Sequence, residues 1–134
     1  MTKQHEILVV DDDRDIRDSL KIILEKNGYS VRLAANGKEA LKQLEAGKPD
    51  LMILDVMMST DTEGFDLAYA LKNKPDFENL PIIMLTSFMD KVREEGPDQF
   101  QHIMGETWPV KWLFEKPIDS GRLIKKIAGI LQAP

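Results

Sequence analysis

The chain contains no cysteine, which excludes disulfide bonds, thiolate metal sites and a cysteine nucleophile. It also lacks a long apolar run near its start, where only four consecutive apolar residues, 7–10, precede three aspartates. Such a run is too short for the core of a signal peptide and far too short to span a membrane. These absences fit a cytoplasmic protein with no membrane segment, and we expect that location.

An excess of positive charge is missing as well, because 18 basic and 23 acidic side chains leave a net charge of −5. Direct binding to nucleic acid favours a basic face, so this balance argues against it. A length of 134 residues suits one domain with a real core. No repeat, low-complexity tract or linker interrupts the sequence, and we expect a single domain over residues 1–134 with no output domain.

Short apolar runs alternate with helix-length segments along the chain. The expected strands are residues 7–10, 29–35, 51–54, 82–85 and 112–115. The expected helices are residues 14–26, 38–46, 65–72 and a last helix capped by Asp119 or Ser120. Runs of this kind are typical of buried parallel strands. A strand–helix unit repeated about five times predicts an α/β fold with a doubly wound, five-stranded parallel sheet and right-handed crossovers.

The residues at the ends of the strands indicate the strand order. The second strand ends in Ala34-Ala35-Asn36-Gly37, whereas each of the other four ends in a polar residue suited to chemistry. An edge strand far from the pocket is expected to contribute nothing to it. This favours the flavodoxin-like order 2-1-3-4-5. The segment between the fourth and fifth strands is enlarged, and Gly96-Pro97 should break its helix.

Ligands in open parallel sheets bind beyond the carboxyl ends of the strands. The residues at those ends here are Asp11-Asp12-Asp13, Asp55, Thr86 and Lys116. Asp13 is expected to cap the following helix, but a cap does not need three carboxylates. Adding Asp55 would crowd like charges unless a cation compensates them. Because Mg²⁺ prefers oxygen ligands and phosphate, the sequence predicts a magnesium site.

The same set suits phosphoryl chemistry. Asp55 beside a metal can attack phosphorus and form an aspartyl phosphate. The Lys116 ammonium is a point charge suited to one phosphate oxygen, and the Thr86 hydroxyl can donate to another. Taken singly, each has a structural reading, as a turn residue, a surface lysine and a β-branched strand end. Their combination in this order is a strong signal.

The chain resembles the receiver domain of two-component response regulators, of the CheY-like single-domain type. The matching motifs are residues 7–13, 53–58, 81–87 and 115–117, which together span nearly the whole sequence. The resemblance implies that Asp55 accepts a phosphoryl group from a phosphohistidine on a sensor histidine kinase or a histidine phosphotransfer protein. It further implies that Lys116 holds the phosphate and that Thr86 moves towards it.

For the metal, the resemblance implies Mg²⁺ bound by Asp12 directly and by Asp11 directly or through water. Asp55 and the backbone carbonyl of Met57 would complete the protein ligands. The protein would catalyse its own phosphorylation and dephosphorylation without being a turnover enzyme.

The sequence departs from the receiver pattern mainly before the fifth strand. Leu113 stands where an aromatic switch residue is common, and Trp108 and Trp112 lie near it. Tryptophan is a frequent interface anchor, although a core role for at least one of them is equally plausible. We hypothesise that residues 88–112 form a recognition element for a downstream protein partner or for self-association.

Two rival functions remain open at this stage. A metal-dependent phosphohydrolase of the haloacid dehalogenase type would want a second carboxylate two residues after its nucleophile, where this chain has Met57. A degenerate receiver could act as a phosphorylation-independent docking module, but the intact acidic, threonine and lysine set counts against that. His5 and His102 are expected to be ordinary surface or boundary residues.

Overall fold

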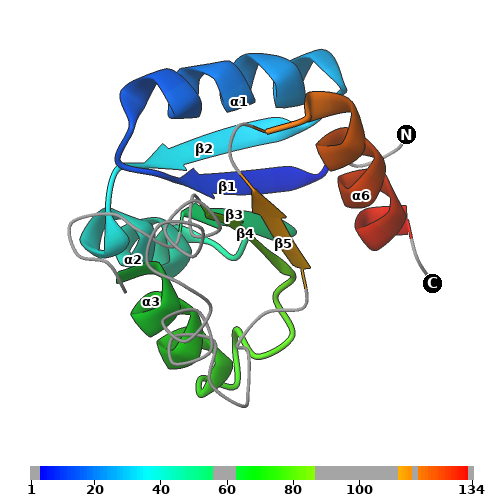
Figure 1. Ribbon diagram of the computed structural model, residues 1–134. Coiled ribbons are helices and arrows are strands. Elements are labelled where there is room, and N and C mark those ends of the chain that lie inside the picture. The colour runs from blue at the N-terminus through cyan, green and yellow to red at the C-terminus, as the bar shows by residue number, and fades with distance from the viewer. Residues whose placement is uncertain (1–3, 56–62, 87–111, 116–117, 133–134) are drawn as a thin grey trace, which may run out of the picture.

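The computed structural model describes residues 4–55, 63–86, 112–115 and 118–132. Its strands form one parallel sheet in the order β2-β1-β3-β4-β5 (Figure 1). The strands are β1 (Glu6–Val10), β2 (Ser30–Ala34), β3 (Leu51–Asp55), β4 (Ile82–Thr86) and β5 (Trp112–Glu115). The predicted flavodoxin-like sheet and its strand order are therefore confirmed.

Helices cover both faces of this sheet. They are α1 (Arg14–Lys26), α2 (Gly37–Ala46), α3 (Glu63–Lys72) and α6 (Ser120–Gln132). In Figure 1, α1 and α6 lie on one side of the sheet, and α2 and α3 lie on the other. The enlarged segment between β4 and β5, with its Gly96-Pro97 break, lies outside the described residues.

Alternating side chains of the strands build two cores, one on each face. In β1, Ile7 and Val9 pack in the cluster that contains α1 and α6, whereas Leu8 and Val10 pack in the cluster that contains α2 and α3. All four side chains are fully buried. Burial on both faces explains why the strand is a continuous apolar run rather than an alternating one.

The ends of α1 are set by local sequence signals. The Asp13 carboxylate accepts hydrogen bonds from two N–H groups of the first turn, so the predicted cap is confirmed. At the other end Gly28 has a φ of +91°, a left-handed conformation that favours glycine. The Tyr29 N–H then donates to the Leu24 carbonyl at 3.1 Å, which closes the helix in a Schellman motif.

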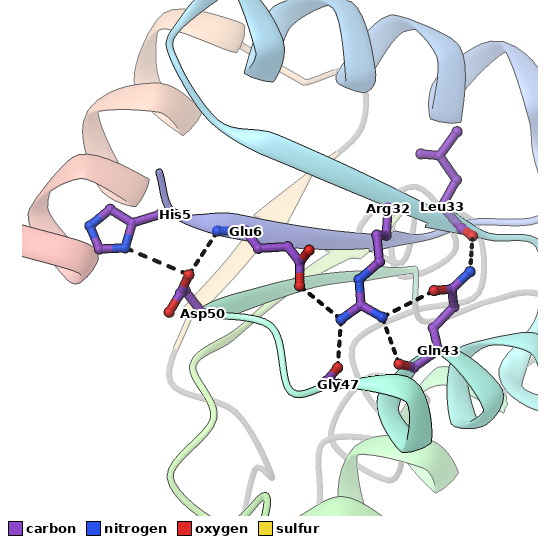
Figure 2. Close-up of polar contacts among 7 residues, drawn as sticks. All are labelled: His5, Glu6, Arg32, Leu33, Gln43, Gly47 and Asp50. Atoms are coloured by element: carbon purple, nitrogen blue, oxygen red, sulfur yellow. Dashed lines mark hydrogen bonds and ion pairs between the residues drawn. The ribbon is translucent and has the colours of Figure 1, made fainter. Parts of the chain in front are cut away.

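A guanidinium group ties β2 to the end of α2 (Figure 2). Arg32 Nη1 donates to the Gln43 carbonyl at 2.7 Å, and Nη2 donates to the Gly47 carbonyl at 2.5 Å. Arg32 Nη2 also lies 3.0 Å from Glu6 Oε1. The carbonyls at a helix C-terminus have no partner within the helix, and a cation there is favourable. Arg32 therefore fastens α2 to the sheet.

A second polar contact joins the starts of β1 and β3 in the same region (Figure 2). Asp50 Oδ2 accepts a hydrogen bond from the Glu6 N–H at 2.7 Å. The same oxygen lies 3.7 Å from His5 Nδ1, and the His5 side chain is 41% exposed. His5 is thus the boundary residue expected from the sequence, while His102 lies outside the described residues.

Candidate functional site

The acidic residues predicted to meet do so at the carboxyl edge of the sheet. β1 and β3 are neighbouring parallel strands, with Val10 opposite Leu54. Asp11 directly follows β1 and Asp55 is the last residue of β3, so the two residues lie next to each other at this edge. Asp11 is 0% exposed and Asp55 is 2% exposed, whereas Asp12 is exposed. One carboxylate oxygen from each of the three lies within 4.8 Å of the others. No other group of three or more such residues gathers in this way in the described part of the chain.

Hydrogen bonds from three directions hold the loop that carries the acidic residues. The Asp11 N–H donates to the Ala34 carbonyl of β2 at 3.1 Å. The Asp13 N–H donates to Asp11 Oδ1 at 2.9 Å. Arg17 Nη1 donates to the Asp11 carbonyl at 2.7 Å. The loop is therefore fixed to β2 on one side and to α1 on the other.

Arg17 is the residue that sequence reasoning missed. Helical periodicity puts its Cβ on the outward face of α1, but its side chain is partly buried and reaches back to the loop. Periodicity indicates where a Cβ points and says little about where the end of a long side chain lies.

The chemistry of this donor set fits a divalent cation. Three carboxylates within 4.8 Å, two of them buried, repel one another more strongly than they would in water. A hard cation with oxygen ligands offsets that repulsion, and Mg²⁺ takes one or two carboxylates together with waters and phosphate oxygens. The three carboxylates can therefore hold a divalent cation beside Asp55.

The structure describes only part of the remaining predicted site. Thr86 ends β4 and is paired in register with Glu115 of β5, so its backbone lies at the same edge as Asp55. The Thr86 side chain, Met57 and Lys116 lie outside the described residues. Their predicted roles stay predictions.

One of the two tryptophans can be placed. Trp112 is partly buried and packs in the core cluster that contains α1 and α6. The core role considered for at least one tryptophan is thus confirmed for Trp112, whereas Trp108 and most of the hypothesised recognition element lie outside the described residues.

The sheet order and the acidic group define a flavodoxin-like α/β protein with three carboxylates gathered at the carboxyl edge of its sheet. The family model for the response regulator receiver domain matches residues 7–128. The chain therefore belongs to the response regulator receiver domain family, as its motifs predicted.

Individual relatives agree with this assignment. The response regulator MprA of Mycolicibacterium vanbaalenii is 47% identical over 88 residues, which cover 66% of this chain and 36% of MprA. The chain thus matches about a third of the length of that curated relative. Chemotaxis response regulator CheY4 of Vibrio cholerae has 30% identity and a TM-score of 0.76, covering 96% of this chain and 100% of CheY4.

A third relative was solved with ligands. The structure of the response regulator TrrA from Thermotoga maritima in complex with Mg²⁺-BeF has 31% identity and a TM-score of 0.76. The similarity covers 96% of this chain and 100% of TrrA.

Proposed function

We propose that this chain is a phospho-accepting switch of two-component signal transduction, in which Asp55 takes a phosphoryl group from a phosphohistidine. The donor is a sensor histidine kinase or a histidine phosphotransfer protein. The observation that carries the proposal is the position of Asp55, buried at the end of β3 with its carboxylate within 4.8 Å of those of Asp11 and Asp12. Membership in the receiver family supports the same role.

The reaction follows from the nucleophile and its surroundings. An oxygen of the Asp55 carboxylate attacks phosphorus while the bond from phosphorus to the imidazole nitrogen breaks. A new oxygen–phosphorus bond forms, and the imidazole nitrogen keeps the electron pair and takes up a proton. Such a transfer depends mainly on positioning and on neutralising the charge of the phosphoryl oxygens. Burial of Asp55 supplies the positioning.

Four groups would hold Mg²⁺ in this proposal: the carboxylates of Asp11, Asp12 and Asp55 and the backbone carbonyl of Met57. When bound, the cation supplies charge neutralisation for the phosphoryl oxygens. The Mg²⁺-BeF complex of TrrA, in which beryllofluoride mimics a phosphoryl group, supports this ligand class. We further propose that Lys116 and Thr86 bind the phosphoryl oxygens, through an ammonium and a hydroxyl respectively.

The signal would leave the domain through protein contacts. Phosphorylation changes the binding of a downstream partner or self-association, without direct contact to nucleic acid or membrane, and the protein has no turnover of an external substrate.

We place the protein in the cytoplasm. Within the described residues, no helix is both long and apolar enough to cross a membrane. The stand-alone organisation over residues 1–134 stays a prediction.

Incubation with acetyl phosphate or phosphoramidate in the presence of Mg²⁺, followed by intact mass measurement, tests the proposal. A receiver gains the mass of one phosphoryl group and keeps it long enough to be weighed. A phosphohydrolase would consume the donor continuously with little labelled protein. A docking module would stay unmodified. Either of the last two results contradicts the proposed function.

A further inference from the structure

Asp12 is the one exposed carboxylate of the acidic group, so packing does not fix its position. Asp11 and Asp55 are buried and are held by the sheet from which they extend. Among the described residues, the hydrogen bonds that can pre-orient the Asp12 side chain act through its own backbone. The hydrogen bonds to the two peptide groups that flank Asp12 therefore fix the direction in which its side chain leaves the backbone.

Both of these peptide groups are held. The peptide between Asp12 and Asp13 donates its N–H to Asp11 Oδ1 at 2.9 Å. The peptide between Asp11 and Asp12 accepts at its carbonyl from Arg17 Nη1 at 2.7 Å. Because a trans peptide is planar, fixing that carbonyl also fixes the Asp12 N–H, which points the opposite way. Of these two contacts, only the one from Arg17 can be removed without altering an acidic residue of the site.

We propose that Arg17 is a positioning residue of the cation site: its guanidinium holds the Asp11–Asp12 peptide so that the Asp12 carboxylate is oriented before the cation arrives. This inference rests on the proposed function, because it assigns the acidic group to a divalent cation. Groups that orient a ligand without touching the metal contribute strongly to metal affinity. A hydrogen bond from a charged donor is also among the stronger ones in proteins.

The charge of Arg17 and its positioning role have opposite effects on Mg²⁺ affinity, so an experiment can separate them. Arg17 carries a positive charge beside the acidic group, and a nearby cation repels Mg²⁺. If the charge were all that mattered, its removal would tighten Mg²⁺ binding. If positioning dominates, removal weakens binding. The sign of the change separates the two explanations.

The test is calorimetric titration of the full chain with Mg²⁺ alone, without a phosphoryl donor. Arg17→Met keeps the aliphatic stem and loses the donor, and it should weaken Mg²⁺ binding about tenfold. Arg17→Lys retains a charged donor and should recover most of that loss. Arg14→Met is the matched control: it removes a positive charge from the same helix, but the Arg14 side chain is 84% exposed and pairs with Asp18. The Mg²⁺ affinity of Arg14→Met should stay within about twofold of that of the wild type.

Thermal unfolding without metal shows whether each variant is folded at the titration temperature. A folded Arg17→Met variant with unchanged or tighter Mg²⁺ binding overturns the inference, as does a loss of the same size in Arg14→Met. If Arg17→Met does not fold, the comparison of Arg17→Lys with Arg14→Met decides. A lower Mg²⁺ affinity in Arg17→Lys than in Arg14→Met supports the inference, because a lysine ammonium replaces the guanidinium donor only in part. Equal affinity in the two variants overturns the inference.

Labelling of Asp55 is measured separately with a small phosphodonor. A wild-type chain that binds Mg²⁺ in an Arg17-dependent manner but takes no phosphoryl group would leave this inference standing and refute the proposed function. Normal labelling of Asp55 together with Mg²⁺ binding that does not depend on Arg17 would refute this inference and leave the proposed function standing.

Discussion

Asp11 and Asp55 are the two buried polar residues of the described part of the chain, and their carboxylate oxygens lie within 4.8 Å of each other. Asp11 directly follows β1 and Asp55 is the last residue of β3, the neighbouring parallel strand. The sheet itself therefore brings the two like charges together. Like charges at this distance in a low-dielectric site oppose folding. In the proposed function, a bound divalent cation would offset this repulsion.

We therefore expect Asp55→Asn to stabilise the metal-free protein. Removing one charge from the buried pair should raise the free energy of unfolding by about 1–3 kcal/mol. Urea denaturation in the presence of a chelator measures this change. Asp18→Asn, on the exposed face of α1, is the control and should change little. A less stable Asp55→Asn variant would show that the two carboxylates do not oppose folding.

Mg²⁺ should stabilise the wild-type protein and do so much less for Asp12→Ala. A ligand that binds only the folded state raises the free energy of unfolding by about 2.7 kcal/mol at a hundred times its dissociation constant. Because Asp12 is exposed, its substitution should leave the metal-free unfolding temperature near that of the wild type. Thermal unfolding at several Mg²⁺ concentrations measures both effects. If Mg²⁺ raised the unfolding temperature of the wild type and of Asp12→Ala equally, Asp12 would not be a ligand of the cation.

Asp12→Ala should also strongly reduce the labelling of Asp55 by a small phosphodonor. In the wild type, excess chelator should reduce that labelling as well. Robust labelling in chelator would rule out a metal-dependent transfer.

The sequence was sufficient for the features that depend on local patterns. The apolar runs predicted the strands, and Asp13 predicted the start of α1. The lack of a residue suited to chemistry at the end of β2 predicted the strand order. The acidic cluster could also be predicted, because parallel strands end at a common edge.

The contacts that could not be predicted join residues far apart in the sequence through the ends of long side chains. Arg32 meets Gly47, fifteen residues away, and Glu6 in another strand. No local motif encodes such partners. Arg17 meets Asp11 in a similar way: its Cβ follows helical periodicity on the outer face of α1, but its guanidinium reaches back to the loop.

Arg32 should be important for stability rather than for function. Arg32→Met removes hydrogen bonds to the Gln43 and Gly47 carbonyls and leaves Glu6 without its ion-pair partner. We expect a loss of about 2–3 kcal/mol in the free energy of unfolding. Urea denaturation measures it, with Lys42→Met on the exposed face of α2 as the control. A loss below that of the control would mean that the end of α2 does not need this contact.

Two glycines should respond to alanine with opposite signs. Gly28 has a φ of +91°, and a Cβ added there would meet no atom within 4 Å, so Gly28→Ala should destabilise by about 1 kcal/mol through backbone strain alone. Gly129 lies within α6 and also has open space, so Gly129→Ala should stabilise by about 0.5–1 kcal/mol. Thermal unfolding of the two variants beside the wild type measures both signs. Changes of the same sign would contradict the assigned end of α1 or the helical state of residue 129.

The central claim is that Asp55 is the sole phosphoacceptor, and site-resolved mass measurement after incubation with phosphoramidate and Mg²⁺ tests it most directly. We predict one phosphoryl group on the peptide that contains Asp55 in the wild type. Asp55→Asn should show no mass gain, because its amide is not a nucleophile for phosphorus. Undiminished labelling of folded Asp55→Asn, or a wild-type phosphoryl group on any other residue, would contradict the account.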